Sequence, residues 1–391
     1  MKRVITTSVS GSTDGRPAIV PVSGISSAAA SHLANAVTTA SVAAAPDGVP
    51  VTSIRHALRA LASEGGALTP SGMKLLRPLV KQAHELLRER LEAGGSVEAY
   101  LRGRTRLADS AVMGLLHIAS VSSRMRGSSM IAPLTAIAVS GYGRSELAPG
   151  SDLDLLFLLP DSSQSGDGAP AAATEACIKM VVAGLWDLGF VLDHAVRSSR
   201  ECLDLACDEP AVLAGLLNRR FLWGGYSLFT ALDADLAGLF SGPLALQWRH
   251  AVDRALASAP GATLSTAAMQ KNEPDVNEPD VKQGPGGLCD LQRALSANTL
   301  ASGRSAALVN PALVEAHRFL WSVRCHLHLL VGRAEDRLRS TLQHDVARRL
   351  GFDELRGATA SHRLLHAFRH HARGVREAAA LAAGSISVQP R

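Results

Sequence analysis

Apolar residues recur three to four positions apart near both ends of the chain, a spacing that is typical of amphipathic helices. Towards the N-terminus the stripe consists of Leu76, Val80, Ala83, Leu87 and Leu91. Gly94 and Gly95 follow it and favour a helix C-terminus. Towards the C-terminus there are two stripes, the first of Leu313, Ala316, Leu320, Val323, Leu327 and Leu330, and the second of Leu338, Leu342, Val346 and Leu350. These patterns predict a helical region at each end of the chain.

Between the two helical regions the period of the pattern falls from about 3.6 to 2, which favours strands. Residues 134–139 are apolar and lead into a glycine-rich turn, residues 152–159 form a second apolar run, and residues 189–197 alternate as a third strand. A helical stripe separates the second strand from the third. This order predicts an α+β fold in which a small mixed sheet is flanked by helices, with N-terminal and C-terminal helical bundles.

The changes of pattern divide the chain into five segments. We expect a disordered tail over residues 1–52, a helical region over 53–130, the sheet domain over 131–225, a second helical domain over 226–380 and a tail over 381–391. A loop over residues 259–290 interrupts the second helical domain, because its repeated NEPDV sequence, prolines and glycines do not suit a regular helix. A long loop inside a compact domain is usually functional or disordered.

Composition narrows the class of protein. Hydrophobic residues make up 47% of the chain, which is enough for a packed core. The net charge of +5 is spread along the sequence and is not interleaved with aromatic residues, so we expect no nucleic-acid binding. No stretch reaches the roughly 18 apolar residues that a membrane span needs, so we expect no membrane association. The five cysteines lack metal-ligand spacing, which favours a reducing cytoplasm.

Asp152 and Asp154 stand at the start of the second apolar run, where carboxylates oppose strand formation. Residues i and i+2 of a strand point to the same face, so these carboxylates lie side by side and suit Mg²⁺, which also takes substrate phosphates. Gly141 and Gly143 of the preceding turn allow backbone N–H groups to approach phosphates, and Arg144 adds a positive charge. The combination predicts a site for a metal and a triphosphate. The alternatives are a solvated strand end and an ordinary tight turn.

These motifs resemble a known family. A glycine turn followed by Asp-x-Asp on a strand is similar to the DNA polymerase β-like nucleotidyltransferases. The fuller string GYGRSELAPGSDLDLLFL, residues 141–158, resembles the bacterial PII uridylyltransferases, which are bifunctional uridylyltransferase/uridylyl-removing enzymes. Three further stretches are similar to that family in the same order: WDLGFVLDHAVRS (186–198), EPDVKQGPGGLCDLQ (278–292) and FLWSVRCHLHLLVGRAEDRL (319–338). The resemblance covers about residues 55–375.

The resemblance implies a nucleotidyltransferase domain that transfers UMP from UTP to a tyrosine of a PII-type nitrogen signal protein. It implies that Asp152 and Asp154 are the catalytic residues and hold Mg²⁺. The residues expected to bind the nucleotide are Ser140, Gly141, Gly143, Arg144, Ser151 and Lys282. Asp290 is expected to be a second polar anchor of the loop that carries Lys282. A purely architectural role for that loop is the alternative.

Three positions depart from the family pattern: Ser140 replaces a glycine, Gln283 a glutamate and Cys289 an arginine. A thiol cannot supply the donors of a guanidinium. The family continues into a uridylyl-removing phosphohydrolase domain and two glutamine-sensing ACT domains, which this sequence lacks. We therefore expect transfer without removal of uridylyl groups and without a response to glutamine. The alternatives are a non-catalytic module that binds a nucleotide or a PII protein, and an adenylyltransferase that acts on another protein.

Asp193 is a candidate for a third metal ligand. Alternation along GFVLDHAVR places Asp193 on one face of the strand together with Val191, Ala195 and Arg197. The wider nucleotidyltransferase superfamily commonly takes a third carboxylate from a later strand beside the Asp-x-Asp strand. We therefore expect Asp193 to join Asp152 and Asp154 around Mg²⁺. The alternative is a surface aspartate paired with Arg197.

Overall fold

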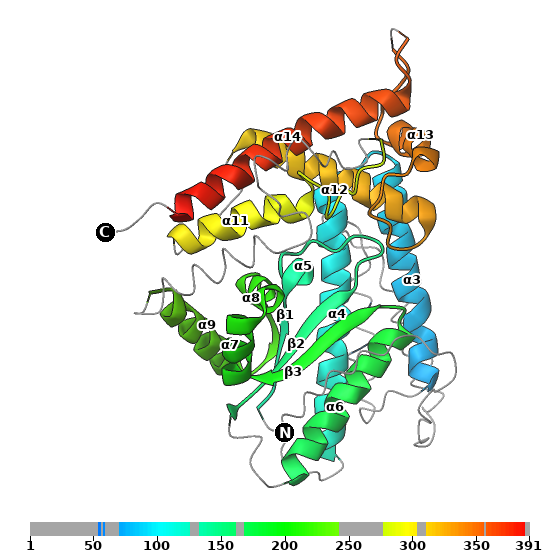
Figure 1. The fold of residues 1–391 in the computed structure, drawn as a ribbon. Helices are drawn as coiled ribbons and strands as arrows, with labels where there is room; N and C mark the ends of the chain where they lie inside the picture. The colour runs from blue at the N-terminus through cyan, green and yellow to red at the C-terminus, as the bar shows by residue number, and fades with distance from the viewer. Residues whose placement is uncertain are drawn as a thin grey trace.

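The computed structural model describes residues 54–55, 58, 70–125, 133–161, 168–241, 277–302, 310–355 and 357–387. The predicted tail over residues 1–52, and residues 259–276 of the predicted loop, lie outside the described residues. Figure 1 shows a central sheet with helices on both sides and the C-terminal helices gathered at one end of it. The prediction of an α+β fold with a mixed sheet flanked by helices is confirmed.

The described strands form one four-stranded sheet in the order β3-β2-β1-β4. Its strands are β1 (Thr135–Ala138), β2 (Leu153–Leu159), β3 (Leu192–Ser198) and β4 (Arg220–Gly224). β1 pairs antiparallel with both β2 and β4, whereas β2 and β3 run parallel. The parallel pair needs a crossover, which α6 (Gly168–Asp187) supplies.

Three strands lie close to where the sequence predicted them, and the fourth does not. The sequence pattern predicted three strands, and β4 is a fourth strand that it did not predict. The glycine-rich turn is also more regular than predicted, because residues 140–143 form a short helix, α5 (Ser140–Gly143). Both differences involve short segments whose conformation is set by contacts with distant residues rather than by local periodicity.

Helices cover both faces of the sheet. Leu153, Leu155 and Phe157 of β2 join the buried cluster that includes α3 (Pro70–Glu92), α4 (Val97–Met125) and α6. Leu156 and Leu158 join the buried cluster on the other face, with α7 (Ser199–Asp208), α8 (Pro210–Leu217) and α9 (Tyr226–Ser241). Because side chains alternate along a strand, Asp154 shares the second face with Leu156.

The C-terminal helices are α11 (Leu288–Ser302), α12 (Pro311–Val331), α13 (Ser340–Arg349) and α14 (Ala360–Ser387). Four residues of the predicted stripe of α12 are buried, Ala316, Leu320, Val323 and Leu327, whereas Leu313 and Leu330 at its ends are partly buried. The helix is capped at its C-terminus by Gly332, whose φ is 74°. Leu338 lies before α13 instead of inside it, and α14 continues to Ser387, into the predicted tail. In the described residues no helix combines the length and apolarity that crossing a membrane would require.

Candidate active site

Asp154 and Asp193 lie beside each other on neighbouring strands. They are register partners in the parallel pair of β2 and β3, and register partners point to the same face of a sheet. Ala195, two residues after Asp193, packs against the same cluster as Leu156. Asp152 precedes Asp154 by two residues and is exposed, as is Asp193, whereas Asp154 is partly buried. The three carboxylates thus surround the end of β2 at which that strand begins.

The electrostatics of Asp154 show how closely these groups act on one another. Its pKa is raised to about 7, first by burial and then by the negative charges of Asp152 and Asp193. The positive charges of Lys282 and Arg144 lower the pKa by less. Four charged residues therefore act on a single carboxyl group, two of them, Asp193 and Lys282, from distant stretches of the sequence, and the two negative charges outweigh the two positive ones.

Asp193 is not joined to Arg197, its alternative partner. Among the ion pairs formed by described residues none links these two, and the charge of Arg197 acts instead on Cys202, whose pKa is raised mainly by burial. Within the same described residues, no three side chains of Asp, Glu, His or Cys are placed so that they could hold a metal ion together. The carboxylates are therefore neighbours without forming a closed set of metal ligands, and the role of Asp193 stays a prediction.

Arg144 is held beside the glycine turn. Its Nε donates to Oε2 of Glu146 at 2.6 Å, and the other carboxylate oxygen of Glu146 lies 2.8 Å from Nε2 of His317 on α12. Burial alone would raise the pKa of Glu146, but the hydrogen bond with His317 and the charge of Arg144 outweigh it, so the pKa is lowered and the carboxylate stays ionised. Arg144 is thus held in place by Glu146, which is itself held by His317.

Arg220 of β4 fixes the backbone of the glycine turn. It donates to the carbonyl oxygens of Tyr142 at 3.2 Å and Gly143 at 3.3 Å. Its two terminal nitrogens also donate to the two carboxylate oxygens of Asp109 on α4, at 2.8 and 3.0 Å. This bidentate pair gives the guanidinium a fixed orientation. Sequence reasoning missed both residues, because they lie 111 positions apart and β4 itself was not predicted.

Ser140 occupies a backbone conformation that favours glycine. Its φ is 53°, in the left-handed region, which costs a residue with a Cβ atom roughly 1–2 kcal/mol. Its Oγ also faces α8, since a Cβ atom on Gly215 would lie 3.0 Å from it. The position at which the family pattern has glycine is therefore a position of strain in this chain.

Replacing Ser140 with glycine should stabilise the protein by about 0.5–1 kcal/mol, because relief of the left-handed strain outweighs the extra entropy of the unfolded chain. Urea denaturation followed by circular dichroism would measure the change in the free energy of unfolding. Ser120→Gly within α4 is the matched control and should destabilise the protein, because glycine disfavours a helix interior. Destabilisation by both substitutions would contradict this account of Ser140.

Ser151, expected to contact phosphate, takes part in a turn. Its Oγ accepts the backbone N–H of Ala148 at 3.1 Å, and its own N–H donates to the carbonyl oxygen of Ala148 at 3.0 Å. The hydroxyl hydrogen is not used by either bond, so the side chain can still donate to a ligand. The turn places Ser151 directly before Asp152.

The loop that carries Lys282 is ordered by two aspartates. Asp280 accepts the backbone N–H groups of Lys282 at 2.9 Å and Gln283 at 2.6 Å. Asp290 is 8% exposed, accepts the N–H of Gly286 at 2.6 Å and forms an ion pair with Arg293. These contacts give Asp290 an architectural role, while Lys282 acts on Asp154 through its charge.

Cys289, which stands where the family pattern has arginine, has an arginine nearby. Burial raises the pKa of its thiol, and the charges of Lys282 and Arg293 lower it by less. Arg293 lies one helical turn later, and its Nε is 3.4 Å from the carbonyl oxygen of Cys289. A guanidinium is therefore present in this region despite the substitution, although it starts from a different turn of α11.

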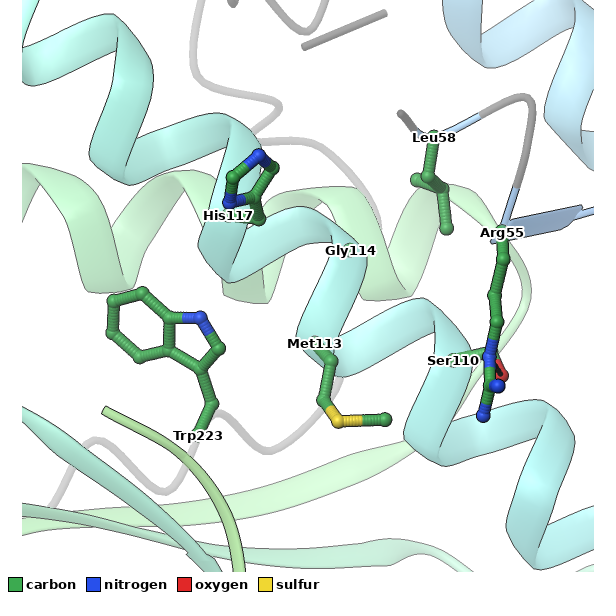
Figure 2. Close-up of a pocket in the computed structure, with 7 residues that line it drawn as sticks. All are labelled: Arg55, Leu58, Ser110, Met113, Gly114, His117 and Trp223. Carbon is green, nitrogen blue, oxygen red and sulfur yellow. Dashed lines mark hydrogen bonds between the residues drawn. The ribbon is translucent and has the colours of Figure 1, made fainter. Parts of the chain in front are cut away.

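A cavity of about 440 Å³ lies elsewhere in the molecule. Figure 2 shows its lining residues, which come from the first described stretch, from α4 and from β4. They are Arg55, Leu58, Ser110, Met113, Gly114, His117 and Trp223. None is a predicted site residue, and β4 is the edge of the sheet opposite to β3. The cavity and the carboxylates are therefore separate features.

Comparison with known proteins finds the family that the sequence motifs resemble. Residues 264–382 match the family model described as GlnD PII-uridylyltransferase. The chain is 31% identical over 327 residues to a bifunctional uridylyltransferase/uridylyl-removing enzyme of Azospirillum brasilense, a match that covers 77% of this chain and 32% of the relative. Enzymes of the same name from Novosphingobium aromaticivorans (31% over 330 residues; 79% and 34%) and Cereibacter sphaeroides (35% over 290 residues; 71% and 30%) are also similar. The chain spans about a third of the length of these relatives.

Proposed function

We propose that this chain transfers UMP from UTP to a tyrosine of a PII-type signal protein. Residues 264–382 match the GlnD PII-uridylyltransferase family model, and the chain is similar to bifunctional uridylyltransferase/uridylyl-removing enzymes. The observation that carries the proposal is the group of charges around Asp154. Asp152 and Asp193 supply negative charge, and Lys282 and Arg144 supply positive charge. A site of this kind suits a triphosphate bound together with a divalent cation.

The residues fit Mg²⁺. The pKa of Asp154 is raised to about 7 by burial and by two other carboxylates, so Lys282 and Arg144 compensate its charge only in part, and a divalent cation would supply the rest. Asp152 and Asp154 would hold the ion, and Asp193 would stand beside them. Bound Mg²⁺ would neutralise charge on the phosphates during transfer.

The chain's own residues would position the reactants. Lys282 and Arg144 would bind phosphate oxygens, and the N–H groups of the turn held by Arg220 would approach them closely. The tyrosine oxygen then forms a bond to the α-phosphorus while the bond to pyrophosphate breaks and the hydroxyl proton is released. Such a reaction depends on positioning and charge neutralisation more than on covalent catalysis. We place it in the cytoplasm, where a PII-type acceptor and UTP would be available.

Transfer of label from α-labelled UTP to a purified PII protein in the presence of Mg²⁺ tests the proposal. We expect labelled PII with UTP and far less with ATP. Labelling from ATP of a different protein would favour the adenylyltransferase alternative. Binding of PII or UTP without any transfer would show a non-catalytic module and would contradict the proposal.

Mg²⁺ affinity should rise as the pH increases towards 7. The pKa of Asp154 is raised to about 7, so the carboxyl group is protonated below that pH and ionised above it. Only the ionised group binds a cation, so affinity should increase up to about tenfold per pH unit below pH 7 and then level off. Isothermal titration calorimetry between pH 5.5 and 8.5 would measure this, with Asp154→Asn as the control that lacks the transition. An affinity that stays constant through pH 7 would count against Asp154 as a ligand.

A further inference from the structure

The loop that enters β2 is clamped from outside the sheet at Gly150, two residues before Asp152. The backbone N–H of Gly150 donates to Nδ1 of His328 on α12 at 3.0 Å. A Cβ atom on Gly150 would lie 2.5 Å from the backbone nitrogen of Ala334, so the loop is in close contact with the segment after α12. The carbonyl oxygen of Pro149 accepts from Arg104 on α4 at 3.0 Å. Asp152 therefore follows a backbone with little freedom to shift.

His328 is buried and bonded at both ring nitrogens. It is 1% exposed. A backbone N–H can only donate, so Nδ1 of His328 must accept, which leaves the proton on Nε2. Nε2 then donates to Oδ1 of Asp336 at 3.1 Å, an oxygen that also accepts from Nε of Arg324 at 2.7 Å. Burial lowers the pKa of His328 more than the bond to Asp336 raises it, which keeps the ring neutral and this tautomer in place.

Asp336 connects this clamp to the loop that carries Lys282. Its backbone carbonyl oxygen accepts the N–H of Val281 at 2.8 Å. Two residues later, the N–H of Leu338 donates to the carbonyl oxygen of Pro279 at 2.9 Å. The segment after α12 thus pairs with the residues immediately before Lys282. One residue, Asp336, contacts His328 through its side chain and the Lys282 loop through its main chain.

We propose that His328 is a positioning residue that ties the two halves of the nucleotide site together, holding the Asp152 loop through Gly150 and the Lys282 loop through Asp336. The two halves lie far apart in the sequence, and each is a loop, so neither is positioned by the sheet alone. Its relevance to nucleotide transfer rests on the proposed function. The two hydrogen bonds that form this link belong to the fold and can be tested independently of activity.

Two substitutions at His328 each remove one of its two hydrogen bonds and keep the other. His328→Asn keeps an acceptor near the position of Nδ1 but does not reach Asp336, whereas His328→Gln places an NH₂ donor near the position of Nε2 and loses the acceptor for Gly150. Amide hydrogen exchange of the full chain, followed by mass spectrometry, would report on both loops. Loss of one hydrogen bond should speed exchange of its segment about fivefold.

In His328→Gln we expect faster exchange in residues 146–153 and wild-type exchange in 280–288, and in His328→Asn the reverse. His326→Gln is the control, because His326 is similarly buried on α12 but its Nδ1 has no hydrogen-bond partner in the described structure. Equal responses of both segments in the two variants, or responses as large in the control, would overturn the proposal. If any variant unfolds, its circular dichroism will show it, and Arg324→Lys offers a milder change on the Asp336 side.

Kinetics would then separate this proposal from the proposed function. With UTP as substrate, His328→Gln should lower kcat because the Asp152 loop loosens, while His328→Asn should mainly raise KM because the Lys282 loop loosens; each change should be about fivefold. Lack of transfer by the wild-type protein would refute the proposed function but leave the exchange result to decide on the clamp. A full exchange response with unchanged kinetics in both variants would limit His328 to a structural role and would overturn the positioning proposal.

Discussion

Replacing Asp154 with asparagine should reduce nucleotide transfer by at least about a thousandfold, while the folded protein becomes more stable. Asp154 is the residue on which all the other charges of the site act. Metal-assisted charge stabilisation contributes several kcal/mol to a transition state, and each 1.36 kcal/mol corresponds to a factor of about ten in rate. Asparagine preserves the shape of the side chain but removes the charge that a cation needs.

The stability effect has a definite sign and pH range. The pKa of Asp154 is raised from 3.8 to about 7, so the folded state holds the proton more tightly than the unfolded state does. The wild type therefore loses stability as the pH rises from about 4 to about 7, and the asparagine variant does not. Above pH 7 the variant should be more stable by about 1–2 kcal/mol, and the difference should shrink towards pH 4.

Transfer assays and urea denaturation at pH 5 and pH 8 would test both effects. Asp204→Asn is the control, since Asp204 is exposed on α7, in the helical layer over the sheet, and does not belong to the site. It should change neither quantity. Near wild-type transfer by Asp154→Asn would show that Asp154 is not a catalytic residue. If Asp154→Asn were less stable than the wild type by the same amount at both pH values, the negative charge of Asp154 would be compensated in the folded protein.

Much of the sheet could be predicted because its signals are local. The apolar run of β2 specifies a buried strand, and two aspartates at its start disagree with that environment strongly enough to mark a site. Alternation along residues 189–197 was sufficient to assign Asp193 to one face of its strand. The structure adds the register, which pairs Asp193 with Asp154 and which no periodicity could have supplied.

The residues that hold the site in position could not be predicted, because their role depends on contacts between residues that are distant in the sequence. Arg220 lies in a five-residue strand that follows a helix almost directly, with no glycine or proline turn between them to mark a boundary. Its partner Asp109 sits on a helix far away in the sequence, and His328 reads as one more residue near the end of an apolar helix. The sequence thus points to the charged residues of the site, whereas the residues that hold them in position can be identified only from the fold.

Gly143 and Gly141 should respond very differently to alanine, although they are two positions apart in one turn. A Cβ atom on Gly143 would overlap the backbone carbonyl oxygen of Asn218 and lie 3.0 Å from that of Ala138. Neither oxygen can withdraw easily, because Asn218 ends α8 and the next residue but one, Arg220, is bonded to the turn itself. Gly143→Ala should therefore destabilise the protein by about 3 kcal/mol or more.

Gly141 has room for a side chain in the folded protein. A Cβ atom there would lie 3.5 Å from the nearest atom, the carbonyl oxygen of Glu146, which is ordinary contact. Gly141→Ala should therefore change the free energy of unfolding by less than about 1 kcal/mol, yet weaken UTP binding, because the methyl group would occupy space through which a phosphate approaches the backbone. Urea denaturation of both variants and UTP titration of Gly141→Ala would measure these effects. Equal destabilisation by the two substitutions would contradict the packing of the turn against Asn218, whereas unchanged UTP affinity in Gly141→Ala would place the phosphates away from this turn and leave Lys282 and Arg144 to bind them.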